Sequence, residues 1–281
     1  MKLKIFHTGH AGFIVEFDNK ILVCDHWSDS YHPFEGSWQK LEKDNFSDTI
    51  MKLLENPDYI WCSHEHGDHY DPTYITQHMK SGTKLIVPQF IDQSLYDRMI
   101  HDNIPADNIL LLGDLKTLQL TPNFQVIMLF EEPAYSNHSS LIIRANDFHF
   151  MHNSDTTPNS HFYDKIKYLD IRQIDLFAGQ YCNPTPYPWV VEMENIEKES
   201  EALEFHHSAI QSYCQMCKKL NVIASIPCAG PAIVPSFDIS LFPAANKLIY
   251  DKEHNLSIIR SVLGSESVLN LISNQTLEFD V

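Results

Sequence analysis

The sequence predicts an α/β fold, a four-layer αββα sandwich in which two β-sheets pack face to face between outer layers of helices. Two observations support this prediction. Short β-rich runs fall into two blocks, and each block is followed by segments with helical spacing. The chain also has 281 residues, 43% of them hydrophobic, which is ample material for one large buried core.

The first β-rich block covers the N-terminal third of the chain. Its strands are short and separated by turn residues, and its first helix begins after Ser47, a suitable N-cap. In chain order, the expected elements are the strands LKIFHTG, GFIVEF and KILVCDH, the helix FSDTIMKLLEN, the strand DYIWCS, a helix from about Pro72, the strand KLIVP and the helix IDQSLYDRMIHDN.

The second β-rich block begins, by the same pattern, at ILLLGD. Its expected elements are the strands ILLLGD, KTLQL, FQVIMLF, SSLIIRA and FHFMHNS, the helix HFYDKIKYLD, the strand IDLFAGQ, a long helix over about 195–220 and the strand VIASIPC. Residues 1–250 are expected to form the main domain. Residues 251–281 are expected to be a C-terminal extension or cap packed on that same domain.

The charge balance restricts the partners of the protein. Twenty basic residues stand against 37 acidic ones, a formal net charge of −17. Such a surface repels phosphate backbones and anionic lipids, so we expect neither a nucleic-acid nor a membrane partner. No apolar run approaches the roughly 18 residues of a spanning helix, and the start MKLKIFHTGHAGF lacks a signal-peptide pattern.

A reducing, cytoplasmic compartment is therefore expected, in which the six cysteines stay unpaired. Cys214 and Cys217 form a C-x-x-C, but they lie within helical spacing and have no second cysteine pair. We interpret them as ordinary helical residues, with a redox or metal role as the minor alternative.

The segment SHEHGDH concentrates metal-binding side chains directly after an expected strand. Alternate residues of an extended segment share a side, so His64 and His66 can reach one ion. The following turn lets Asp68 and His69 face a second ion. Imidazole and carboxylate groups suit zinc, iron and manganese. The alternative is chance clustering on a wet loop, which the H-x-H-x-D-H register after a strand argues against.

One turn cannot complete a site for two metal ions. His138 lies just before an expected strand, and Asp155 lies just after the next one. Both are strand-end positions, where loops gather active-site groups. A carboxylate can bridge two metal ions, and we assign that role to Asp155. Taken singly, either residue would more often be a surface or capping residue, so the first cluster is what gives them weight.

These residues, in this order, resemble the pattern of the metallo-β-lactamase superfamily. The resemblance extends from Lys2 to about Pro235 and implies a metal site at one edge between the two sheets. It also implies Asp68 and Asp155 as the catalytic residues. The implied ligands are His64, His66 and His138 for the first metal, Asp68 and His69 for the second, and Asp155 between them.

Several segments are further similar to the CMP-N-acetylneuraminate hydroxylase branch, which also includes a diiron hydroxylase of terpenoid biosynthesis. That resemblance implies two iron ions, a small-molecule substrate, dioxygen and an electron donor. The segments concerned are KILVCDHWSDSYHPFEGSW, MHNSDTTPN, LFAGQYCNPTPYPWVVEME and IPCAGPAIV.

The chain departs from the hydrolase pattern where those enzymes place a late histidine for the second metal. The corresponding segment IPCAGPA offers Cys228 instead, as the hydroxylase branch does. His10, His26 and His152 are candidate replacements, because all three lie at expected strand ends. His26 stands where the family tends to have the proline of DPW, and a loop histidine bonded to backbone is an equally good interpretation of it.

Two further departures concern the hydroxylase branch itself. The sialic-acid enzyme carries a Rieske iron–sulfur domain with paired Cys-x-His and Cys-x-x-His segments, and no such pair occurs in this sequence. Electrons would then come from a partner or from the substrate. In addition, His138 stands where that enzyme has a carboxylate, which makes the first site more like the ordinary superfamily site.

Three functions follow from these patterns. Zinc or manganese ions imply a metallohydrolase of the lactonase or phosphoesterase kind, and L-ascorbate-6-phosphate lactonase is a relative with a similar GHA start. Iron ions imply an oxygenase, which we favour because several separate segments resemble the hydroxylase branch. A metal-loaded binding protein without turnover would need a closed site and is the least favoured.

Overall fold

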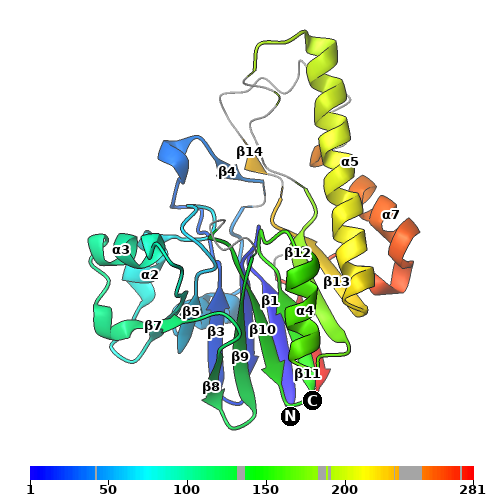
Figure 1. The fold of residues 1–281 in the computed structure, drawn as a ribbon. Helices are drawn as coiled ribbons and strands as arrows, with labels where there is room; N and C mark the ends of the chain where they lie inside the picture. The colour runs from blue at the N-terminus through cyan, green and yellow to red at the C-terminus, as the bar shows by residue number, and fades with distance from the viewer. Residues whose placement is uncertain are drawn as a thin grey trace.

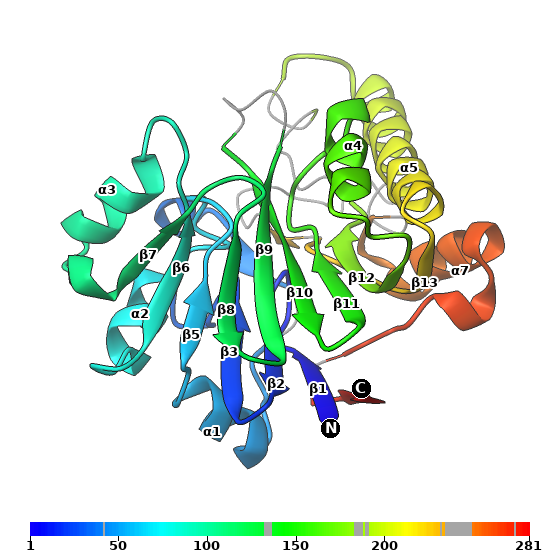
Figure 2. The same cartoon turned by 60° about the horizontal axis from the view of Figure 1, so that its bottom comes forward.

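Two β-sheets lie face to face in the computed structural model of the protein, with helices on both outer sides (Figures 1 and 2). This arrangement is the four-layer αββα sandwich that the sequence predicts. The structure describes residues 1–41, 43–131, 137–182, 188, 191–230, 232–233, 249–272 and 274–281.

The first sheet has seven strands in the order β15-β1-β2-β3-β5-β6-β7. Antiparallel pairing joins β15, β1, β2 and β3, and parallel pairing joins β3 to β5, β6 and β7. The bounds are β1 (Lys2–His7), β2 (Phe13–Phe17), β3 (Lys20–Cys24), β5 (Tyr59–Trp61), β6 (Lys84–Pro88), β7 (Ile109–Leu112) and β15 (Thr276–Asp280).

The second sheet has six strands in the order β13-β12-β11-β10-β9-β8. Strands β8 to β11 pair antiparallel, and β11, β12 and β13 pair parallel. The bounds are β8 (Thr117–Thr121), β9 (Phe124–Phe130), β10 (Ser139–Ala145), β11 (Phe148–His152), β12 (Ile174–Gln180) and β13 (Val222–Cys228). A separate two-stranded ribbon pairs β4 (Gln39–Lys40) with β14 (Ala232–Ile233).

Two groups of helices cover the outer faces, as Figure 2 shows. One group packs on the first sheet through a cluster that includes Ile50, Tyr74 and Met99, and the other packs on the second sheet through a cluster that includes Phe162 and Tyr213. The helices are α1 (Asp48–Leu54), α2 (Pro72–His78) and α3 (Ser94–His101) on the first sheet, and α4 (Ser160–Tyr168), α5 (Asn195–Lys219) and α7 (Lys252–Leu263) on the second.

The main apolar core lies between the two sheets. It joins Phe13 and Trp61 of the first sheet to Phe150 and Leu176 of the second, and all four are almost fully buried. Burial of each such side chain stabilises the fold by about 1.5–3 kcal/mol. Moving the two sheets apart would expose these side chains, so the core holds the sheets at a fixed spacing. The strand ends at the edge of the sandwich are thereby fixed as well.

The strands and helices expected as far as Cys228 are all present, with one error in how they are grouped. The segment ILLLGD, expected to open the second block, forms β7 and pairs parallel with β6 in the first sheet. Residues 251–281 contribute α7, which packs beside α5, and β15, which pairs with β1. None of the helices in the described ranges has the length and apolarity needed to cross a bilayer.

Candidate metal centre

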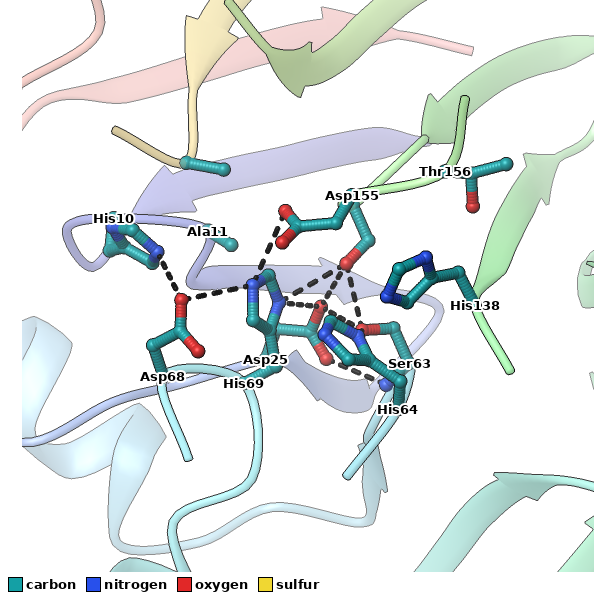
Figure 3. A network of polar contacts seen from close by, with 12 residues as sticks. His10, Ala11, Asp25, Ser63, His64, Asp68, His69, His138, Asp155 and Thr156 are labelled. Carbon is teal, nitrogen blue, oxygen red and sulfur yellow. Dashed lines mark hydrogen bonds and ion pairs between the residues drawn. The ribbon is translucent and has the colours of Figure 1, made fainter. Parts of the chain in front are cut away.

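Loops from both sheets meet at one edge of the sandwich and bring the predicted site residues together (Figure 3). The segment 64–69 follows β5, and His10 lies in the turn between β1 and β2. From the second sheet, His138 directly precedes β10 and Asp155 follows β11 by three residues. Four loops that are distant in sequence thus build one cluster.

A first group of donors consists of the three histidines predicted for the first metal. One ring nitrogen each from His64, His66 and His138 lies within 4.8 Å of the others. The ring centroid of His64 is 4.5 Å from that of His66 and 4.6 Å from that of His138. His64 is buried and His138 is partly exposed, so the group lies at the rim of the core.

A second group lies directly beside the first. Donor atoms of His10, Asp68 and His69 lie within 4.8 Å of one another, and His10 Nε2 is 3.0 Å from Asp68 Oδ2. His69 also forms a third such group with His64 and Asp155, with 3.3 Å between His69 Nε2 and Asp155 Oδ1. Asp155 is therefore placed between the two groups, where a bridging ligand would have to be (Figure 3).

The three candidate replacements for the late histidine differ in the contacts of their ring nitrogens and in whether they belong to a donor group. His10 belongs to the second group, as described above. His152 uses both ring nitrogens within the protein: Nε2 donates to the Ala11 carbonyl at 2.7 Å, and Nδ1 accepts from the Ser154 amide at 3.1 Å. His26 contacts the Thr8 hydroxyl through Nδ1 at 2.9 Å and belongs to no donor group among the described residues. The geometry therefore favours His10.

Several donor atoms in this cluster are buried and have no hydrogen-bond partner. They are His64 Nε2, Asp68 Oδ1, His69 Nε2 and Asp155 Oδ1. A buried polar atom without a partner costs about 1–3 kcal/mol, so four of them converging on one place require an explanation. Imidazole nitrogens and carboxylate oxygens suit divalent zinc, iron or manganese, and such ions would satisfy all four atoms.

The electrostatics of the cluster also fit bound cations. Burial and the neighbouring histidines hold the pKa of His64 well below its ordinary value, which keeps a lone pair available for a metal. Burial alone would also lower the pKa of His69, but the carboxylates of Asp155 and Asp68 outweigh it and raise that pKa well above its ordinary value. The carboxylates thus favour positive charge at this point, which a metal ion can supply in place of a proton.

Asp25 supports the second group from behind, a role that the sequence patterns did not reveal. Its fully buried carboxylate accepts from the Ser63 amide at 2.8 Å, the Ser63 hydroxyl at 2.7 Å and the Ser154 hydroxyl at 2.9 Å. It also lies 2.9 Å from Nδ1 of His69, which leaves Nε2 of that ring for a metal. The only sequence signal was the position of Asp25 at the end of a strand.

Three residues around the cluster adopt left-handed backbone conformations. The φ angles are 48° at His10, 43° at Asp25 and 51° at Ser154. Such conformations are uncommon for residues other than glycine, and they persist where the surrounding contacts enforce them. Here the left-handed conformations direct the side chains of these three residues, which follow strands, toward the donor groups.

The loop that carries the metal-binding motif is also held from outside by the segment 31–34. Gly67 is packed so closely against Pro33 that a Cβ atom at this position would lie 2.5 Å from Pro33 Cβ and 3.3 Å from the Tyr31 hydroxyl. The ring of Phe34 lies over the same loop, with its centroid 6.2 Å from that of His66. Contact with this segment therefore fixes the position of the loop.

Replacing Gly67 with alanine is expected to displace the loop and weaken metal binding. Overpacking of this kind costs about 1–3 kcal/mol, which thermal unfolding of the metal-free protein would detect. Gly82→Ala is a matched control, because nothing lies within 4 Å of a Cβ at that position. Equal melting temperature and metal affinity in G67A and the parent would show that the loop is not held by this contact.

No protein-family model matches the chain. A protein of Mycolicibacterium smegmatis, provisionally named a Rieske 2Fe-2S iron–sulfur protein, is 22% identical over 246 residues, 82% of this chain and 44% of the relative. A similarly named protein of Mycobacterium tuberculosis is 21% identical over 245 residues, with the same coverage. The chain thus spans less than half the length of the curated relatives it matches.

Solved structures resemble the whole chain more completely. Igni18, a metallo hydrolase from Ignicoccus hospitalis, has a TM-score of 0.62 at 15% identity and covers 100% of both chains. CmlA, a diiron β-hydroxylase from Streptomyces venezuelae, has a TM-score of 0.61 at 13% identity and matches 100% of this chain to 54% of its own. YhfI of Bacillus subtilis, described as a metallo-β-lactamase fold protein, has a TM-score of 0.56 at 12% identity over 99% of both chains.

Proposed function

We propose that this chain, which has the metallo-β-lactamase fold, is a dinuclear metal-dependent enzyme, and that it is a non-haem diiron oxygenase acting on a small molecule. The observation that carries the proposal is the pair of adjacent donor groups with Asp155 between them. Dioxygen and an electron donor would be the co-reactants. One oxygen atom enters a C–H bond of the substrate, and the other leaves as water after an electron pair and two protons arrive from the donor.

Two lines of support favour iron over other ions. The segments similar to the hydroxylase branch include MHNSDTTPN and IPCAGPAIV, and the latter lacks the late histidine of the hydrolases. The fold is also that of CmlA, a diiron β-hydroxylase. When bound, the two ions would supply the redox chemistry that activates dioxygen.

The residues of the chain would position and assist this chemistry. His64, His66 and His138 would hold the first ion, while Asp68 and His69, with His10, would hold the second. Asp68 would have a further role, because its carboxylate has two oxygens: Oδ2 lies 3.0 Å from His10 Nε2, and Oδ1 is buried without a protein partner. When one of them holds the ion, the other would take up or deliver a proton next to the bound substrate.

A metallohydrolase with zinc or manganese is the second candidate. The first group contains three imidazoles, which suit zinc, and the fold matches that of Igni18 over the full length of both chains. In that case the ions would supply an activated hydroxide for attack on a carbonyl or phosphoryl centre. Asp68 would again be the residue that receives the proton.

The first experiment is a measurement of metal content and reactivity. The protein is produced with added iron, purified without oxygen, and analysed for metals by mass spectrometry. We expect about two irons per chain. After reduction with dithionite and removal of the excess, the protein should consume dioxygen rapidly in a stopped-flow measurement. The His66→Ala variant is the control and should lose iron and oxygen consumption together.

Other outcomes separate the two candidates. Because overexpression can load the wrong ion, the metal-free protein is also titrated with iron(II), zinc and manganese. Two tightly bound zinc or manganese ions, with hydrolysis of a lactone or phosphodiester substrate and no oxygen consumption, would replace the oxygenase by the hydrolase. Failure to bind any of these ions would contradict both.

A further inference from the structure

The carboxylate of Glu131 lies behind the first donor group. Its Oε2 is 2.8 Å from Nδ1 of His138, and its Oε1 accepts from the Thr157 amide at 3.0 Å. We propose that Glu131 is a positioning residue of the metal centre, which orients His138 for the first ion and ties it to the loop of Asp155. The inference rests on the proposed dinuclear site. It adds to that site Glu131, a residue that lies outside the H-x-H-x-D-H motif.

Local structure explains why these two side chains meet. Strands β9 and β10 pair antiparallel up to Phe130 and Ser139, and Glu131 and His138 continue that register by one step. The Glu131 amide donates to the His138 carbonyl at 2.9 Å, so the backbone pairing also continues. Directly opposite residues of an antiparallel pair present their side chains on the same face, close enough to contact.

The contact decides which nitrogen of His138 can bind a metal. A carboxylate oxygen accepts a hydrogen bond, so the proton of the neutral imidazole is placed on Nδ1. The lone pair is then on Nε2, at the far end of the ring from Glu131. Carboxylates that hold a metal-binding histidine in this way fix its tautomer and orientation and increase its basicity.

The second oxygen of Glu131 extends this control to the bridging position. Thr157 follows Asp155 by two residues, so its amide hydrogen bond to Oε1 fixes the loop that carries Asp155. Glu131 is only 9% exposed, and both of its oxygens are used within the protein. One side chain therefore couples a ligand of the first ion to the residue placed between the two ions.

Glu131→Gln is the sharpest test, because the glutamine has nearly the same shape but an altered hydrogen-bonding pattern. Its amide oxygen can keep the bond from the Thr157 amide, which leaves the NH₂ group facing His138 Nδ1. An NH₂ group donates, so it favours the tautomer with the proton on Nε2, which blocks the metal-binding nitrogen. We expect one of the two ions to bind about 10–100-fold more weakly than in the parent protein.

The affinity is measured by titrating metal-free protein with zinc against a chromogenic chelator. The cobalt(II)-loaded protein gives a second readout, since its visible spectrum reports the ligands of the ion. The spectrum of E131Q should lose the contribution of one site. Glu131→Asp, which keeps a carboxylate, should recover part of the affinity, and recovery of this kind would not follow from a purely structural role.

Asp114→Asn is a matched control, because Asp114 lies in the turn between β7 and β8 and contacts the residue next to Glu131. Asp114 accepts from the Phe130 amide at 2.9 Å and pairs with Lys165 at 2.9 Å, and the described structure records no contact between Asp114 and the donor groups. D114N should therefore keep both ions and the parental cobalt spectrum. If D114N weakened the zinc as much as E131Q did, general loosening of β9 would explain the result and the inference would be overturned.

The remaining outcomes distinguish this inference from the proposed function. If the parent protein binds two ions and E131Q binds both with the same affinity and spectrum, only the role of Glu131 is wrong. If the parent protein binds no zinc or cobalt, the dinuclear centre itself is wrong, and the role of Glu131 fails with it. If E131Q does not fold, the comparison of E131D with D114N decides the matter.

Discussion

Asp155→Ala is expected to weaken the binding of both metal ions by at least about a hundredfold and to abolish activity. Asp155 forms a donor group with His64 and His69, so it borders the ligands of both ions. Its buried Oδ1 lies 3.3 Å from Nε2 of His69, so removing it takes this ion-pair contact from the metal-free protein. The loss should appear in metal content measured by mass spectrometry and in competition titrations with zinc.

Fold and metal binding can be separated in this experiment. Metal-free D155A loses the contact with His69, so its melting temperature is measured first and metal binding is compared well below it. Asp175→Ala removes another partly buried aspartate of the second sheet, one that accepts from the His149 amide at 2.8 Å. D175A should retain both ions. Full metal content in D155A would exclude Asp155 as a ligand and leave the bridging position without a residue.

Asp25→Ala is expected to give the largest loss of stability, about 3–5 kcal/mol in the free energy of unfolding of the metal-free protein. The substitution leaves four donor groups of Ser63, Ser154 and His69 without their buried acceptor. Each such group retains its desolvation cost and loses its compensation. Urea unfolding in the presence of EDTA measures this loss without a contribution from bound metal.

Asp58→Ala is the matched control for that experiment. Asp58 also accepts from a backbone amide, that of Ile21, at 2.9 Å, but its side chain is 31% exposed. Water can replace it as a partner, so a loss of about 1 kcal/mol is expected. Similar losses in D25A and D58A would mean that the buried network of Asp25 contributes no more than an ordinary surface bond.

Most of the fold could be predicted because its signals are local. The strand that leads into the motif, for example, is a short apolar run bounded by turn residues, and Ser47 caps the first helix as expected, with its side chain accepting from the Ile50 amide. The sheet to which a strand belongs is not a local property. β7 was expected to join the strands that follow it, but its parallel pairing with β6 places it in the first sheet.

The candidate site likewise contains residues that local spacing predicts and residues whose role depends on contacts between distant segments. His64, His66, Asp68 and His69 share one turn, so their spacing alone predicts that they converge. The choice among His10, His26 and His152 could not be predicted, because all three lie at strand ends. It depends on which ring nitrogens are already occupied by Thr8, Ala11 and Ser154, and the contacts with Thr8 and Ala11 come from segments that are distant in sequence. The role of Asp25 was hidden for the same reason.

The pairing of β15 with β1 has a consequence for how the protein is made. Lys2 is opposite Asp280, so the outer partner of β1 is synthesised only after the whole chain between them. At about 5–20 residues per second, the interval on the ribosome is on the order of tens of seconds. During that time, β1 is an unprotected sheet edge that another nascent chain could join.

The residues of β1 reduce this hazard. Lys2 and Lys4 alternate with buried residues along the strand, and lysines on an open edge discourage pairing with a second chain. In the finished protein, the same side chains pair with Glu278 and Glu16. The two lysines are thus expected to discourage aggregation during synthesis. In the folded protein, they form ion pairs with glutamates of the two neighbouring strands.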